Sequence, residues 1–114
     1  MLAKIEPTAS FKDNLAQLPA IDGVQSLVIR APDGTVVATI ENAPGKQGSL
    51  AVYQYLHLCA GRLDADAAQH GLAIFGEHTP DARSRPGAHP NIDRLLEIVA
   101  GGPALSVEVV PAAG

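Results

Sequence analysis

The sequence predicts an α/β (α+β) fold: a two-layer sandwich in which the main helices cover one face of a four-stranded mixed sheet. Glycine and proline divide the chain into short segments. Some of these segments alternate apolar and polar residues, as strands do, whereas others repeat apolar residues with the period of a helix. The resulting order is α-β-β-α-β-α-β. Because three of the strands alternate instead of being apolar throughout, we expect a two-layer sandwich rather than a doubly wound sheet.

The composition indicates one small domain over residues 1–114, with room for a single hydrophobic core. Twelve acidic residues against eight basic ones, a net charge of −4, argue against nucleic-acid binding, which needs an excess of lysine and arginine. No apolar run approaches the roughly 20 residues of a membrane span. The N-terminal residues lack the order of a signal peptide, so a cytoplasmic location is expected. The single cysteine, Cys59, excludes an internal disulfide and a cysteine-rich metal site.

The N-terminal part predicts a helix and then a hairpin. Ser10 is expected to cap a helix over residues 11–18, which carries apolar residues on one face and ends before Pro19. Residues 24–31 and 35–41 alternate as strands, and the Pro-Asp-Gly sequence between them favours a tight turn. In the first strand Leu27 and Ile29 are expected to share one face. In the second strand Val36, Ala38 and Ile40 are expected to share one face.

The middle of the chain predicts a long helix and a shorter one. A turn-rich stretch ends at Gly48 or Ser49, either of which would cap the long helix, and the apolar stripe of that helix includes Cys59. Asp64 is then expected to cap a second helical piece, which Gly71 closes.

The C-terminal part predicts two more strands with one helix between them. Residues 72–76 form an apolar run of strand length, and the polar segment 77–90 that follows is predicted to be a loop. Asn91 is expected to cap a helix that a Gly-Gly-Pro sequence stops, and residues 105–109 alternate as the last strand. With two β-α-β crossovers, the last three strands would be parallel and the first strand would be antiparallel to them.

This topology predicts where a ligand would bind. The segments after the second and third strands would emerge at the same end of the sheet and lead into helix N-termini, which favour anions. The first segment, residues 45–49, has two glycines, a lysine and a serine, and we predict Lys46, Gly48 and Ser49 as ligand-binding residues. The spacing is not that of a P-loop. The alternative is a simple turn with a solvated lysine and a capping serine, which is the more common outcome for so short a motif.

The second segment, residues 77–90, concentrates titratable side chains. They are His78, Asp81, Arg83, Arg85 and His89. Two arginines can bind a carboxylate or a phosphate, so Arg83, Arg85 and His89 complete the predicted ligand-binding set. The alternative is a flexible surface loop, braced by proline, whose charges only keep it in solution.

These side chains do not predict a metal centre or a cofactor site. His78, Asp81 and His89 lack the fixed spacing of a metal motif, and the sequence offers no convincing fourth ligand. Cys59 lies on an apolar stripe, as a buried structural cysteine does. An enzyme that uses His78 or His89 as acid–base catalyst is the last of three hypotheses, because a domain of this size forms a deep pocket only by dimerising.

Three segments resemble a known family. They are residues 10–19, 48–53 and 89–96. In these segments the chain resembles a small family of uncharacterised bacterial proteins, a domain of unknown function. The resemblance implies a stand-alone bacterial cytosolic domain and implies no catalytic residue.

The leading functional hypothesis is a small binding domain that recognises an anionic small molecule or a carboxylate at the carboxyl end of its sheet. The alternative is a module for protein–protein interaction or homodimerisation without a small-molecule site. This alternative rests on the two edges that an open four-stranded sheet leaves and on the valine-rich last strand, which could pair with a second copy.

Overall fold

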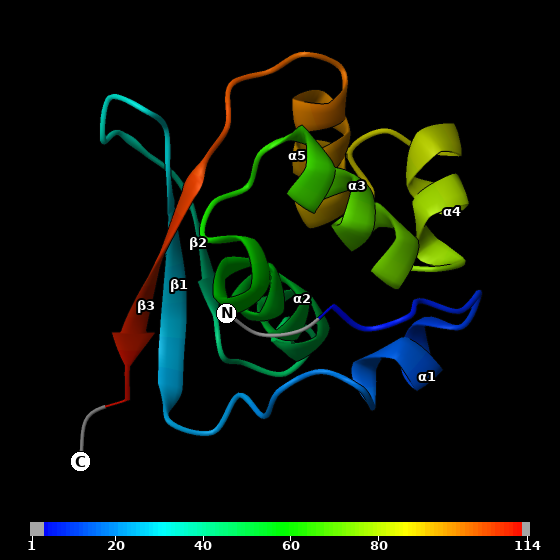
Figure 1. Ribbon diagram of the computed structural model, residues 1–114, viewed down its shortest axis with the longest axis horizontal. Helices are drawn as coiled ribbons and strands as arrows, with labels where there is room; N and C mark the ends of the chain where they lie inside the picture. The colour runs from blue at the N-terminus through cyan, green and yellow to red at the C-terminus, as the bar shows by residue number, and fades with distance from the viewer. Residues whose placement is uncertain (1–3, 113–114) are drawn as a thin grey trace.

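An antiparallel sheet of three strands forms one side of the molecule in the computed structural model, which describes residues 4–112 (Figure 1). The strands are β1 (Val24–Arg30), β2 (Val36–Glu41) and β3 (Ser106–Pro111). β1 lies in the middle and pairs with β2 on one edge and with β3 on the other. The predicted four-stranded mixed sheet is therefore wrong, since the sheet has three strands and both neighbouring pairs are antiparallel. The combination of helices and strands is confirmed, and β1 is antiparallel to the other two strands as expected.

The hairpin of β1 and β2 is confirmed. Leu27 pairs with Ile40 and Ile29 pairs with Ala38, so these apolar residues share the face that packs on the helices. The turn between the strands places Gly34 at φ 91°, a conformation that glycine adopts without strain.

A register shift near the start of β2 changes the expected face of Val36. Ile29 pairs with Ala38, whereas Arg30 pairs with Val36, so Val37 is the extra residue of a bulge. As a result Val36 does not share the buried face with Ala38, and Val36 and Val37 are 49% and 48% exposed.

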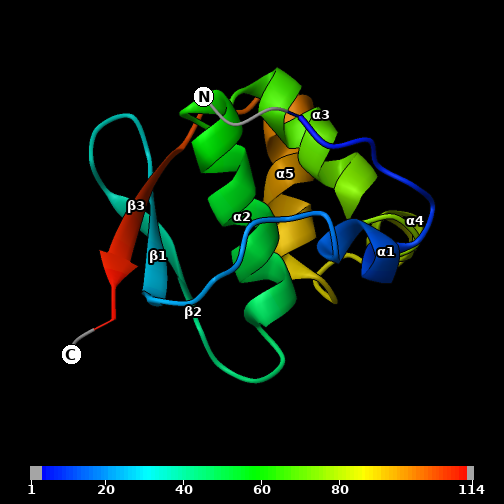
Figure 2. The ribbon, with the colours of Figure 1, turned by 60° about the horizontal axis from the view of Figure 1, so that its bottom comes forward.

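The helices lie on one side of the sheet, as expected (Figures 1 and 2). They are α1 (Phe11–Leu15), α2 (Gln47–Ala60), α3 (Ala65–Ile74), α4 (His78–Ser84) and α5 (Pro90–Val99). α2 contacts all three strands, α3 packs on α2 and α5, and α4 packs on α5. The helices therefore extend outward from the sheet as a stack and do not form one covering layer.

The predicted strand over residues 72–76 is wrong, because α3 continues through Gly71 to Ile74. Gly71 does not close the helix. A Cβ at this position would lie 2.8 Å from side-chain atoms of both Leu56 and Leu95, so the glycine lets α2 and α5 pack closely on α3. The apolar run that follows Gly71 is the buried face of this helix.

The predicted loop over residues 77–90 is also wrong in part, since its first half forms α4. Pro80 lies in the first turn of α4, where its missing N–H would have no helical partner in any case. The Thr79 hydroxyl donates to the Leu72 carbonyl at 2.6 Å and holds α4 against the last turn of α3.

The order of elements after α2 removes the expected common edge of parallel strands. α3, α4 and α5 follow one another without a strand between them, and β3 then returns antiparallel to β1. The two segments that were expected to meet at the carboxyl end of a parallel sheet instead meet at the N-terminal ends of α2 and α5.

The helix caps are confirmed at two positions and wrong at two others. The side chains of Ser10 and Asp64 accept backbone N–H groups at the starts of α1 and α3, as expected. The N-cap of α2 is Lys46 instead of Gly48 or Ser49, and the N-cap of α5 is His89, one residue before Pro90, instead of Asn91.

The core lies between the sheet and α2 and continues among the helices. Its fully buried side chains include Leu27, Ile29, Tyr53 and Tyr55, and Cys59 is buried there as predicted. Among residues 4–112, no helix combines the length and the apolar character that a membrane span requires.

Candidate functional site

A pocket of about 550 Å³ opens where the first turns of α2 and α5 meet α1 and the junction of α3 with α4. We call it the aromatic pocket. Its lining residues are Phe11, Leu15, Gly45, Gln47, Gly48, Ser49, Phe75, His78, Ala88, His89, Pro90, Asn91 and Ile92. Both segments singled out in the sequence contribute to this one pocket.

The six predicted ligand-binding residues divide into two groups. Gly48, Ser49 and His89 line the aromatic pocket. Lys46 is exposed at the N-cap of α2, and neither it nor the two arginines is among the lining residues.

The two arginines lie on different sides of α4 and its C-terminal turn. Arg83 lines a separate shallow hollow with Pro86 and Leu96, on the side of α4 that faces α5. Arg85 instead reaches Asp81, one helical turn earlier, and donates to both of its carboxylate oxygens. The expectation that both arginines face one ligand does not fit this placement.

The N-terminal end of α2 differs from those of the other helices in the charge of its first turn. Lys46 makes no side-chain capping bond, and the first turn of α2 contains no acidic residue. Each of the other helices has an acidic residue in its first turn: Asp13, Asp66, Asp81 and Asp93. Since an unpartnered helix N-terminus carries about half a positive charge, the start of α2 is the strongest uncompensated positive end around the pocket.

His89 is held from behind by a carboxylate. Its Nε2 lies 2.6 Å from Oδ2 of Asp81, and the same carboxylate binds Arg85. Hydrogen bonds from Arg85 and then from His89 hold the pKa of Asp81 well below its usual range. Because an ionised carboxylate can only accept, Nε2 of His89 carries its hydrogen, and Nδ1 is the ring nitrogen left for a ligand.

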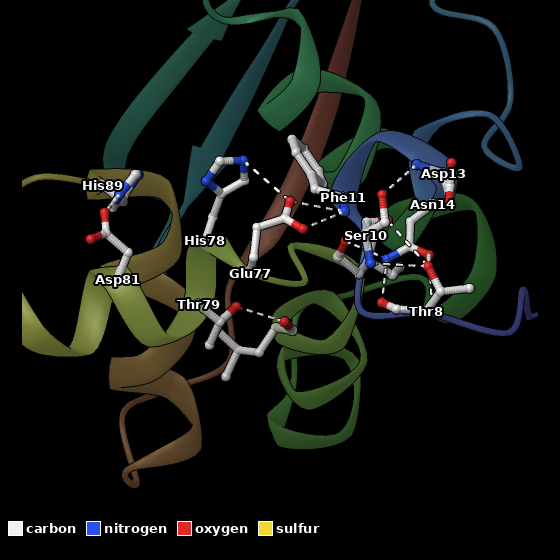
Figure 3. A network of polar contacts seen from close by, with 12 residues as sticks. Thr8, Ser10, Phe11, Asp13, Asn14, Glu77, His78, Thr79, Asp81 and His89 are labelled. Atoms are coloured by element: carbon white, nitrogen blue, oxygen red, sulfur yellow. Dashed lines mark hydrogen bonds and ion pairs between the residues drawn. The ribbon is translucent and has the colours of Figure 1, made fainter.

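The His78 ring has the ring of His89 on one side and the ring of Phe11 on the other. The rings of the two histidines are 5.8 Å apart, and the ring of Phe11 meets His78 edge to face at 5.1 Å. Figure 3 shows Glu77 between His78 and the backbone of Phe11, with His89 next to Asp81. His78 Nε2 lies 3.7 Å from Glu77.

The wall formed by α1 is fixed by polar contacts. Glu77 accepts the Phe11 N–H at 3.0 Å, and the buried Asn14 side chain donates to the carbonyls of Thr8 and Ile74 at 2.9 Å each (Figure 3). Gly76, at φ 56°, permits this approach, since a Cβ there would lie 2.8 Å from the Ala9 carbonyl oxygen. These contacts place the Phe11 ring in the pocket.

A second pocket of about 440 Å³, the hairpin pocket, lies between α5 and the β1–β2 hairpin. It is lined by Ala31, Val37, Pro90, Asp93, Arg94, Glu97, Ile98, Gly102, Pro103 and Leu105. Its arginine is already engaged, because Arg94 donates to the Tyr53 hydroxyl at 3.1 Å and to Oδ1 of Asn91 at 2.9 Å. Burial raises the pKa of Tyr53 to about 12, although the positive charge of Arg94 acts to lower it.

The sequence reasoning missed the apolar residues of the aromatic pocket. Phe11, Leu15 and Phe75 carry the spacing of core residues, and nothing in that spacing separates a pocket wall from a core. One available signal was that Phe75 lies three residues before His78 in the sequence, whereas no local pattern connects Phe11 with the singled-out histidines. Within residues 4–112, no three histidine, cysteine or acidic side chains are grouped as metal ligands would be.

Comparison with known proteins gives a family and no function. No curated protein and no solved structure matches the chain. Residues 11–109 match the model of a family described as an uncharacterized protein conserved in bacteria (DUF2322). This match covers every element from α1 through most of β3, as well as all residues of the aromatic pocket. The chain therefore belongs to this bacterial family, as its resemblance had implied.

Proposed function

We propose that this protein is a small binding domain that recognises an anionic small molecule, in particular a carboxylate, in the aromatic pocket. The observation that carries the proposal is the start of α2, which enters the pocket without a side-chain cap and without an acidic residue in its first turn. The proposed binding site thus lies at helix ends and not, as the sequence predicted, at the carboxyl end of a parallel sheet.

Each contributing residue has a distinct part in binding. The backbone N–H groups of Gln47, Gly48 and Ser49 have no partner within the helix. They donate to the ligand at the N-terminal end of α2. The Ser49 hydroxyl adds one more donor. His89 donates to the anion through Nδ1 in its protonated form, in which both ring nitrogens carry a hydrogen and Nε2 still donates to Asp81. Arg85 acts as a positioning residue, since it orients Asp81 behind His89.

A charge placed at the start of α2 tests the proposal. Ser49→Asp puts a carboxylate where the anion would sit, and it also suits the positive end of the helix, so the variant should remain folded. Ala65→Asp is the matched control, because it adds the same charge at the start of α3, outside the pocket.

The measurement is thermal unfolding with a panel of acetate, benzoate, phenylacetate and inorganic phosphate. A compound at 100 times its Kd stabilises the fold by about 2.7 kcal/mol. We expect at least one of these anions to raise Tm of the native protein and of Ala65→Asp, but not of Ser49→Asp. An equal rise in Ser49→Asp, or no rise with any of them in the native protein, would refute the proposal.

A second candidate function is a protein-interaction or homodimerisation module. The specific observation is the open edge of β2, where the bulge leaves Val36 and Val37 about half exposed beside the hairpin pocket. The expected dimer edge, β3, is also an edge strand. Light scattering should then show a dimer that Val37→Lys converts to a monomer, and a native monomer at high concentration would exclude homodimerisation. A cytoplasmic location stays a prediction.

A further inference from the structure

Four rings stand in a row along the aromatic pocket. Phe75 stacks on Phe11 with centroids 5.2 Å apart and 30° between the ring planes, Phe11 meets His78, and His78 lies beside His89. All four line the pocket, and they include both phenylalanines of the chain. The row thus passes from two apolar rings to two rings with nitrogen atoms.

The apolar end of the pocket is a firm surface. Phe75 is only 3% exposed and belongs to the core, whereas Phe11 and Leu15 are partly buried against that core. Ile92, 2% exposed, lies beneath this end of the pocket on α5. A ligand that reaches this end must offer apolar surface, since no polar side chain is among these four residues.

The polar end accepts one negative charge rather than two. No lysine, arginine, aspartate or glutamate is among the lining residues in the described part of the chain. The positive field at this end comes mainly from the start of α2, because Asp93 lies in the first turn of α5, and one helix terminus carries about half a unit of charge. Asp81, ionised behind His89, would repel the second charge of a phosphate.

We propose that the ligand of the aromatic pocket is a monocarboxylic acid with a compact, ring-sized apolar body, an inference that rests on the proposed function. The carboxylate lies at the start of α2 and against His89, and the apolar body lies against Phe11, Phe75 and Ile92. Phe11 is the specificity-determining residue, because it provides the ring that joins the two ends of the pocket.

Four probes separate the features of this ligand. Benzoate has the charge and the ring, acetate has the charge alone, benzamide has the ring alone, and inorganic phosphate has more charge without a ring. Burial of a phenyl-sized body contributes about 1.5–3 kcal/mol, so benzoate should bind at least about tenfold more tightly than acetate. Benzamide and phosphate should bind more weakly than benzoate by a similar or larger factor.

The experiment is a titration of the native protein and of Phe11→Leu with each probe, followed by nuclear magnetic resonance of the backbone amides. The expected result is that the shifts at Gly48 and Ser49 saturate with benzoate, and that Phe11→Leu reduces the ratio of benzoate to acetate affinity several-fold. Val99→Leu, an apolar exchange in the hollow that Arg83 lines, should leave this ratio unchanged.

The outcomes distinguish this inference from the proposed function. Phosphate or acetate bound as tightly as benzoate, and lost in Ser49→Asp, would overturn the monocarboxylate and leave the anion site standing. Benzamide bound as tightly as benzoate would show that the pocket selects the ring and not the charge, which overturns both. Binding of none of the four probes also overturns both.

Discussion

The sheet side and the helical side of this molecule treat polar side chains differently. On the outer face of the sheet, Arg30 and Glu108 form a cross-strand ion pair that is open to water. On the helical side, Asn14, Thr79 and Tyr53 are buried, and each donates to a backbone carbonyl of another helix: those of Ile74, Leu72 and Asn91, respectively.

This difference explains why the pockets form among the helices. A strand satisfies its backbone groups by pairing, whereas a helix leaves carbonyl and N–H groups unpartnered at its ends. Here Asn14 and Thr79 satisfy carbonyls at the C-terminal end of α3, and Tyr53 donates to the Asn91 carbonyl at the start of α5, so these contacts fix where those helix ends lie. The unpartnered N–H end of α2 is held in the same cluster, and it opens into the aromatic pocket.

The largest effect is expected for Asn14→Ala on the helical side. The substitution removes bonds to the backbone of Thr8 and Ile74 in a fully buried place and should lower the free energy of unfolding by about 2–4 kcal/mol. Because Phe11 belongs to the same short helix, binding of benzoate in the aromatic pocket should also be lost.

The matched change on the sheet side is Asn42→Ala. Asn42 donates to the Val24 carbonyl at 2.8 Å but is only partly buried, so the loss should be about 0.5–1.5 kcal/mol. Urea unfolding of both variants makes the comparison. Equal losses would contradict the view that the helical side depends more heavily on its buried polar groups.

The same contrast describes what the sequence could predict. The sheet side was largely predictable, because strand alternation and the Pro-Asp-Gly turn are local patterns that fix which residues face the core. The direction of β3, antiparallel to β1, is as expected, but the number of strands in the sheet was not predictable in this way. The misassigned residues 72–76 added a strand that does not exist.

The helical side was less predictable because its decisive contacts are between distant residues. Gly71 has the local character of a helix stop, yet its place under Leu56 and Leu95 makes it a packing position. Pro80 has the local character of a loop, yet it lies in a first helical turn. The candidate site was predictable only in part. Gly48, Ser49 and His89 lie near helix starts, which local patterns indicate, whereas the roles of Phe11 and Phe75 depend on tertiary packing.

A smaller effect is expected from acid, and it involves a partly buried polar contact between α2 and α3. Nε2 of His70 on α3 lies 2.7 Å from the Tyr55 hydroxyl, which accepts the Ile5 N–H. Burial, with a contribution from Lys4, lowers the pKa of His70 below 6.5. The unfolded chain therefore binds a proton at His70 more readily than the folded protein does. The contribution of His70 to the free energy of unfolding should be complete above about pH 6.5 and should decline below it.

The measurement is the urea midpoint at about pH 7.5 and about pH 5.5, a range that lies above the titration of ordinary carboxylates. His70→Gln should lose most of the decline between the two values of pH. His78→Gln is the control, since the His78 ring is 44% exposed, and its decline should match that of the native protein. A native midpoint that rises toward pH 5.5 would contradict the assignment.

The smallest effect is expected on the sheet side, at the pair of Arg30 and Glu108. The Nη2 and Oε1 atoms lie 3.1 Å apart, but the two side chains are 39% and 57% exposed. Since water and salt screen such a pair, a double-mutant cycle with Arg30→Gln and Glu108→Gln should give a coupling of about 0.2–1 kcal/mol that falls in high salt. A coupling above about 2 kcal/mol would mean that water does not reach this face in solution. That result would favour the interaction module, because a second protein surface over the sheet is what would exclude the water.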